Sequence, residues 1–210
     1  KSYILNATYA IPLESATLKV TGFGYLLEFE DAIGLSSQTY GIRAVGKKGI
    51  FSGSATYAQQ SDYKDQPVDY DEPYYAAELN AKYQGFSAGL GYEVLSGDGT
   101  IGFSTPLATL HKFNGWADKF LATPADGLED LYVKAGYTKK GVGPLDMVKV
   151  AVIYHDFEAE DSGDDYGSEL DLLAVAKVGK VSFTAKYADY NEDGFATDTE
   201  KLWFSVGYKY

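Results

Sequence analysis

The sequence predicts an all-β protein, a transmembrane antiparallel up-and-down β-barrel of the outer-membrane type, and three observations predict it. Apolar and polar residues alternate with period two through most of the 210 residues. The connections between the predicted strands are alternately short and long. The last predicted strand has one apolar face and ends on Tyr210.

Eleven strands are predicted from the alternation, at residues 2–11, 15–29, 36–46, 49–60, 73–84, 86–95, 128–140, 146–157, 168–179, 181–190 and 199–210. Most have about ten residues, the length that crosses a bilayer at a tilt. A soluble β-sandwich would show the same alternation, so alternation alone does not separate the two folds.

The connections favour the membrane barrel. Short links are predicted at residues 12–14, 46–49, 84–85, 141–145 and 179–180. Longer acidic links, at residues 30–35, 61–72, 96–127, 158–167 and 191–198, take turns with them. Short periplasmic turns and long outer loops are typical of outer-membrane barrels. The first strand would then run inward, so either the strand count is off by one or N-terminal strands precede Lys1. We expect residues 1–210 to form a single domain of a larger, even-stranded barrel that includes such strands.

The composition excludes several classes of protein. A formal net charge of −12 disfavours nucleic-acid binding, which needs clusters of Lys and Arg. The absence of Cys excludes a disulfide scaffold and any Cys-based metal site or nucleophile. No apolar run is long enough to predict a transmembrane helix, and no signal peptide begins at Lys1, so we expect a mature or trimmed chain.

The last strand also predicts partners. Leu202, Phe204, Val206, Tyr208 and Tyr210 form one apolar face, which resembles the C-terminal signal by which outer-membrane barrels are recognised for assembly. We therefore expect contacts with the barrel-assembly machinery, membrane lipid and lipopolysaccharide in the outer membrane of a Gram-negative bacterium.

Charged residues on the polar strand faces predict a hydrated lumen, because a Lys or Arg facing lipid at the midplane would cost about 2–4 kcal/mol. The predicted pore-lining residues are Lys19, Arg43, Glu78, Lys82, Glu93, Lys134, Lys149, Asp171, Lys177 and Lys186. Alternation assigns Lys209 to the same face. Their basic excess favours a channel for small or anionic solutes. The alternative is a set of mutually paired charges with no role in selectivity.

The connection at residues 96–127 is too long to be a simple turn. We expect them to fold inward and constrict the lumen, with His111, Phe113, Trp116, Asp118, Lys119 and Phe120 as the constriction residues. The spacing of Phe113, Trp116 and Phe120 predicts a short inserted helix. The alternative is an outward lid.

The same region carries a family resemblance. Residues 102–133 read GFSTPLATLHKFNGWADKFLATPADGLEDLYV. The runs TPLATLH, FNGWADKF, TP and GL within them resemble a segment of the outer-membrane proteins of the alginate-export family. This resemblance implies a monomeric barrel, larger than this chain, in which the chain is the C-terminal part. The type member exports an anionic polysaccharide, so an anionic saccharide is an implied solute.

A calcium loop is a further possibility. Asp189, Asn191, Asp193, Gly194 and Glu200 match the spacing of a calcium-binding loop, although strands rather than helices flank it. An acidic outer loop also matches this pattern by chance, and no cofactor is otherwise predicted.

Catalysis is disfavoured, because the chain has two His residues and no catalytic motif. His155 lies beside Asp156 near an outer rim, but nothing ties it to a nucleophile. Three hypotheses remain: a channel, a non-conducting surface or structural barrel plugged by its own loop, and a barrel enzyme.

Overall fold

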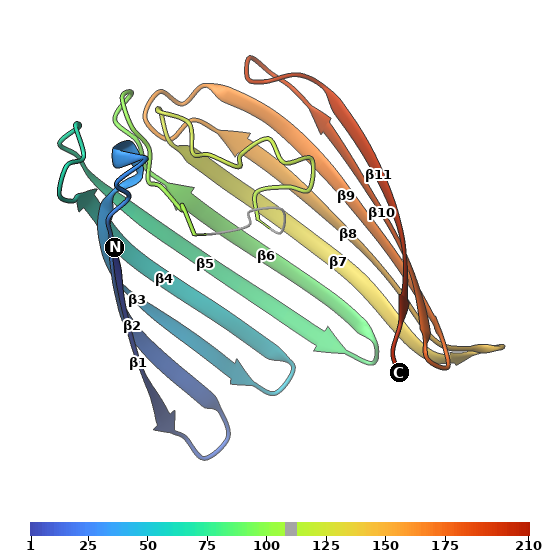
Figure 1. Cartoon of the computed structure of the whole chain (residues 1–210). Helices are drawn as coiled ribbons and strands as arrows, with labels where there is room; N and C mark the ends of the chain where they lie inside the picture. Colours follow the sequence, from blue (N-terminus) through green and yellow to red (C-terminus); the bar gives the residue numbers. More distant parts are fainter. Residues whose placement is uncertain (108–112) are drawn as a thin grey trace.

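The chain forms one antiparallel sheet of eleven strands in sequence order (Figure 1). The computed structural model describes residues 1–107 and 113–210. The strands are β1 (Ser2–Pro12), β2 (Thr17–Leu27), β3 (Ser37–Lys48), β4 (Phe51–Asp62), β5 (Asp71–Tyr83), β6 (Phe86–Leu95), β7 (Leu128–Val142), β8 (Leu145–Glu158), β9 (Asp165–Val178), β10 (Val181–Asn191) and β11 (Thr199–Tyr208). All eleven predicted strands are present, so the predicted fold class is confirmed.

The two kinds of connection lie at opposite ends of the sheet. Each strand pairs with the next one along the chain, and the short links are hairpins of two to four residues at one end. The long links gather at the other end, where η1 (Ile33–Leu35) is the one helical element of the described residues (Figure 1). In that part of the chain no helix is long and apolar enough to cross a membrane.

The sheet is strongly curved, and β1 and β11 are its two edges (Figure 1). No pairing joins these two strands in the described part of the chain. We call the concave side the inner face and the convex side the outer face. We call the connection at residues 96–127 the inward segment, because its described residues, 96–107 and 113–127, lie over the inner face (Figure 1).

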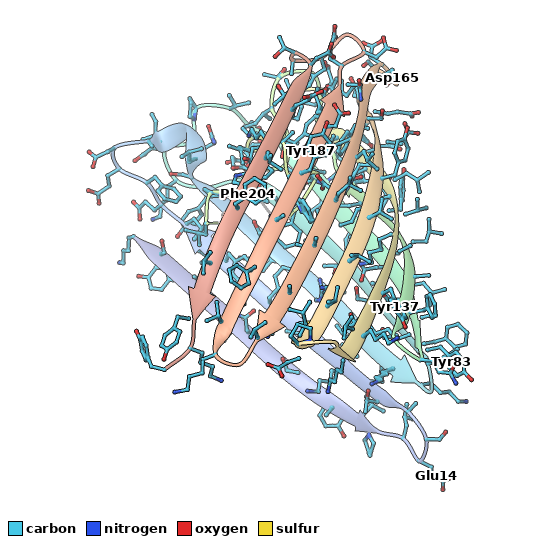
Figure 2. The ribbon with its side chains drawn as sticks, turned by 90° about the vertical axis from the view of Figure 1, so that its right-hand side faces the viewer. Glu14, Tyr83, Tyr137, Asp165, Tyr187 and Phe204 are labelled. Carbon is cyan, nitrogen blue, oxygen red and sulfur yellow. The ribbon has the colours of Figure 1, made fainter. Side chains whose placement is uncertain are left out.

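The outer face is apolar and exposed. Its exposed side chains include Ile42, Leu79, Leu90, Val133, Val152, Leu172, Phe183, Phe204 and Val206. Tyr83 and Tyr137 lie near the end with the short turns, whereas Asp165 lies at the opposite end (Figure 2). An apolar surface of this extent is typical of a face that contacts lipid, and aromatic rings near one rim suit a membrane interface.

The buried core lies between the inward segment and the inner face, and not between two sheets. Phe103, Trp116, Ala117 and Phe120 of the segment belong to one buried cluster with residues of the sheet. Within it the Phe120 ring lies 4.6 Å from the ring of Phe157. The described residues of the segment therefore cover part of the inner face, and no described element covers the outer face.

Candidate functional site

All ten predicted pore-lining residues lie on the inner face. Directly opposed residues of antiparallel strands point to the same side of a sheet. The register therefore connects Glu78 through Gly91 and Tyr132 to His155, and it connects Arg43 through Thr56 and Ala76 to Glu93. The same tracing places Lys19, Lys82, Lys134, Lys149, Asp171, Lys177 and Lys186 on this face.

The inner-face acid Glu78 is fully engaged by its neighbours. Its Oε2 accepts hydrogen bonds from the Tyr132 hydroxyl at 2.7 Å and from Lys134 Nζ at 2.5 Å, and its Oε1 accepts one from Asn80 Nδ2 at 2.6 Å. Gly91 lies between Glu78 and Tyr132, and a Cβ there would overlap the tyrosine ring. The glycine thus lets β7 side chains reach across β6, and Glu78 and Lys134 compensate each other's charge.

Most of the inner-face basic residues, by contrast, are exposed. Lys82, Lys149 and Lys177 lie near the short turns, and no ion pair joins any of them to a described residue. Arg43 and Lys19 are exposed as well, and Arg43 donates a hydrogen bond of 3.2 Å to Thr56. The uncompensated charge of this face is therefore positive toward the short-turn end.

The inward segment is held to the sheet by its residues 113–120. Lys186 lies over the Trp116 ring, 4.1 Å from its centroid, and Lys201 pairs with Asp118 at 2.9 Å. Lys119 lies over the ring of Tyr190. Five of the six predicted constriction residues, Phe113, Trp116, Asp118, Lys119 and Phe120, thus belong to a stretch that crosses the inner face; His111 lies outside the described residues.

The predicted inserted helix is wrong for the described part of the segment. Asn114, Gly115 and Asp118 have positive φ angles of 53°, 82° and 60°. A right-handed helix requires negative φ at every residue, so these three positions impose turns instead. The aromatic residues have near-helical spacing in the sequence, but the backbone between them forms two turns and not a helix.

A cluster of buried acids lies beneath these turns, and sequence reasoning missed two of its members. Asp130, Glu169 and Asp171 are fully buried, and His155 is nearly so. His155 Nδ1 lies 2.8 Å from Asp130, and its Nε2 lies 3.8 Å from Asp171. Asp130 lies four residues before Lys134, and Glu169 lies two residues before Asp171, so both have the parity of a predicted inner-face residue. This shared parity was the signal that could have found them.

The segment is bound to this cluster by hydrogen bonds. Asn114 Nδ2 donates to Glu93 at 3.0 Å and to Asp130 at 3.3 Å, and the Ala117 backbone N–H donates to Glu169 Oε1 at 2.7 Å. Glu93 also accepts from the Tyr74 hydroxyl at 2.5 Å. These three hydrogen bonds from Asn114 and Ala117 hold the segment against the inner face.

A cavity of about 500 Å³ lies between the inward segment and strands β1–β6. Its lining includes Arg43 and Glu93 together with the aromatic residues Phe23, Tyr74 and Phe103. Because Glu93 is already bound by Tyr74 and Asn114, Arg43 is the charged donor that this cavity offers to a solute.

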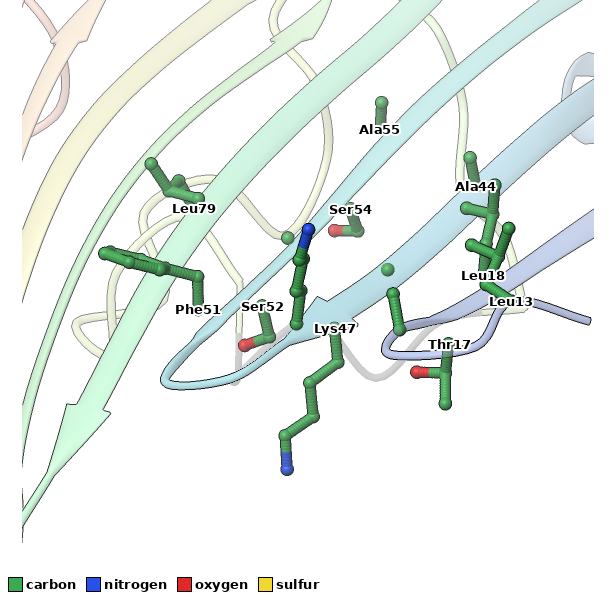
Figure 3. Close-up of a pocket in the computed structure, with 14 residues that line it drawn as sticks. Leu13, Thr17, Leu18, Ala44, Lys47, Phe51, Ser52, Ser54, Ala55 and Leu79 are labelled. Atoms are coloured by element: carbon green, nitrogen blue, oxygen red, sulfur yellow. The ribbon is translucent and has the colours of Figure 1, made fainter.

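A second cavity, of about 440 Å³, is a shallow groove near the short turns (Figure 3). Gly46 and Gly53 are opposed in the register, and their lack of side chains leaves the space between Leu18 and Leu79. Leu79 is exposed on the outer face. The groove is thus part of the apolar outer surface and does not belong to the inner face.

The predicted calcium ligands find no support in the structure. Asp189 and Glu200 are opposed in the register of β10 and β11, while Asn191 and Asp193 lie further along an extended hairpin. Among the described residues, no group of three or more acidic or His side chains could hold a metal ion. A calcium loop places its ligands around the ion, whereas an extended β-hairpin keeps the corresponding residues apart.

The His155 geometry does not support the enzyme hypothesis. Neighbouring residues of a strand point to opposite faces, so Asp156 does not share the face of His155. The two ring nitrogens of His155 face Asp130 and Asp171, so neither faces a hydroxyl nucleophile.

The sheet, its sorted connections and its two unlike faces define the chain as the wall of an outer-membrane-type β-barrel. Among solved structures, the chain is similar to the crystal structure of OccK11 (OpdR) of Pseudomonas aeruginosa, an outer-membrane porin, with 16% identity and a TM-score of 0.66. The match covers 98% of this chain and 57% of that one, and at this identity it shows the fold alone. No family model and no curated protein matches the chain, so the resemblance to the alginate-export family has no support from these comparisons.

Proposed function

We propose that this chain forms part of the wall of an outer-membrane channel that passes small or anionic solutes through a hydrated, mildly cationic lumen. The observation that carries the proposal is that the basic side chains of the inner face are mostly exposed, whereas its acidic side chains are bound or buried. Lys19, Arg43, Lys82, Lys149 and Lys177 are exposed, whereas Glu78, Glu93 and Asp171 are bound by neighbours or buried. Exposed basic side chains along a pore favour anions.

The route of a solute follows from the same face. The cavity beside Arg43 lies under the long connections, and the exposed lysines lie toward the short turns. An anionic solute would pass from one basic side chain to the next without a strong binding site that could trap it. The resemblance of residues 102–133 makes an anionic saccharide one such solute.

The outer face supports the location and partners proposed with this function. Its exposed apolar side chains suit lipid contact, and long connections at one end of the sheet suit the outer rim of such a barrel. We further propose a Gram-negative outer membrane, delivery by the barrel-assembly machinery and a monomeric barrel.

A second candidate function is a non-conducting surface or structural barrel. The dense contacts of residues 113–120 with β6, β7, β9, β10 and β11 favour it, because a segment held this firmly could close the lumen. Conductance of the complete protein in a planar bilayer separates the two: stable current steps support the channel, and a silent bilayer from folded protein supports the plug.

A further inference from the structure

The buried acids beneath the inward segment carry more negative charge than their neighbours compensate. Glu93, Asp130, Glu169 and Asp171 meet at the turn of residues 114–117. Among the residues that the structure describes, His155 and Lys186 are the basic groups that face them. Even with both of these protonated, four ionised carboxylates would leave two negative charges in a buried site.

Glu169 and Asp171 are the least satisfied members of the cluster. Both side chains are fully buried, and Glu169 Oε2 and both carboxyl oxygens of Asp171 have no hydrogen-bond partner. The two carboxyl groups face each other across adjacent inner-face positions of β9. Burying ionised carboxylates without partners is very costly, and two carboxyls that share a site avoid the cost by keeping one proton.

In the described part of the chain, no group of three or more acidic or His side chains has the arrangement to hold a metal ion. The other charged and titratable groups that face the pair from the surrounding elements are His155, Asp130, Glu93, Lys186, Tyr190, Asp118 and Lys201. Asp118 and Lys201 compensate each other at 2.9 Å.

We propose that Glu169 and Asp171 form a proton-binding site that couples pH to the docking of residues 113–120 on the inner face. The Ala117 N–H donates to Glu169 Oε1, and a Cβ at Gly115 would overlap the Glu169 carboxylate, so the segment covers this pair directly. When the segment leaves, water reaches both carboxyls and the shared proton is lost. The docked state therefore binds one proton more than the released state.

The direction and the size of the effect follow from this difference. Acid favours the docked state and alkali the released state, and the ratio of docked to released molecules changes about tenfold per pH unit for one proton. If the chain forms a channel as proposed, acidification closes it. That consequence rests on the proposed function, whereas the docking equilibrium does not.

The test uses Trp116, which is buried when docked. In a Trp203→Phe background Trp116 is the single tryptophan of residues 1–210, so acrylamide quenching of its fluorescence in detergent micelles reports docking between pH 5 and 9. We expect quenching to rise with pH. Glu169→Gln retains an acceptor for Ala117 and offers Asp171 a donor, so quenching should stay low at every pH; Asp171→Asn, which removes the second charge, should behave alike.

Asp146→Asn is the matched control, because this acid lies on β8 near the short turns, where it accepts a hydrogen bond from Gly179. It should keep the full pH dependence. The proposal would be overturned if quenching in the background protein did not change with pH. It would also be overturned if quenching kept its pH dependence in both Glu169→Gln and Asp171→Asn. A pH-dependent quenching signal with a silent bilayer would instead refute the channel and leave the proton site standing.

Discussion

The backbone N–H of Ala117 donates a 2.7 Å hydrogen bond to the buried carboxylate of Glu169, 52 residues further along the chain. This contact fixes a connection between two strands onto a third, distant strand. It holds part of a long connection against the inner face. Under the proposed function, the passage of a solute along this face would depend on how firmly residues 113–120 are held.

Gly115→Ala should release the segment. Gly115 has a φ of 82°, and a Cβ there would overlap the Glu169 carboxylate, so the substitution adds a steric clash to backbone strain of about 1 kcal/mol. We expect higher acrylamide quenching of Trp116 in the Trp203→Phe background. Gly141→Ala is the matched control, because Gly141 has a φ of 64° but nothing within 4 Å of an added Cβ. Equal quenching in the two variants would argue against a role for this close approach.

Removing Lys134 should destabilise the sheet through Glu78. Both side chains are 29% exposed and lie 2.5 Å apart, so Lys134→Met leaves a half-buried carboxylate with neutral donors only. We expect a loss of about 1–2 kcal/mol in the free energy of unfolding, measured by urea titration in detergent. The double variant Glu78→Gln with Lys134→Met should recover part of that loss. Additive losses would mean that the pair does not interact energetically.

The hydrogen bonds to Asp98 should make the stability of the turn at residues 98–101 weakly dependent on acid pH. Backbone N–H groups of Ile101 and Thr100 donate to its carboxylate and hold its pKa below the usual range. A lowered pKa in the folded state stabilises the turn at residues 98–101 above the ordinary Asp pKa, and this stability is lost as the pH falls through the lowered value. Carboxyl NMR titration should therefore find Asp98 titrating below the ordinary Asp range. A titration of Asp98 within that ordinary range would contradict the assignment.

Alternation predicted the strands and the inner face because side chains in a sheet alternate strictly, and a slip of one residue would have inverted both. That is why Lys19 and Lys186, at opposite ends of the chain, were both placed on the correct face. The contacts of the inward segment were not predictable in this way. They join residues such as Asp118 and Lys201 that are 83 positions apart, and no local periodicity encodes such a distance.

The helix prediction at residues 113–120 failed for a related reason. The aromatic spacing was compatible with a helix, but Asn114-Gly115 is a pair that favours left-handed backbone, and the structure uses it as a turn. The buried acids show the same limit. Asp130 and Glu169 were on the predicted inner face, but only the folded segment explains why they are buried there and partnered by Asn114 and Ala117.

The most direct test of the channel is the zero-current potential of the complete protein in a planar bilayer under a salt gradient. A cationic inner face predicts an anion-selective potential. Lys149→Glu combined with Lys177→Glu should shift this potential toward cation selectivity, because both residues are exposed on the inner face. Lys139→Glu, one residue from the inner-face Thr138 and pointing outward, should leave it unchanged. A cation-selective potential, or one that the inner-face pair does not move, would contradict a lumen whose selectivity comes from these lysines.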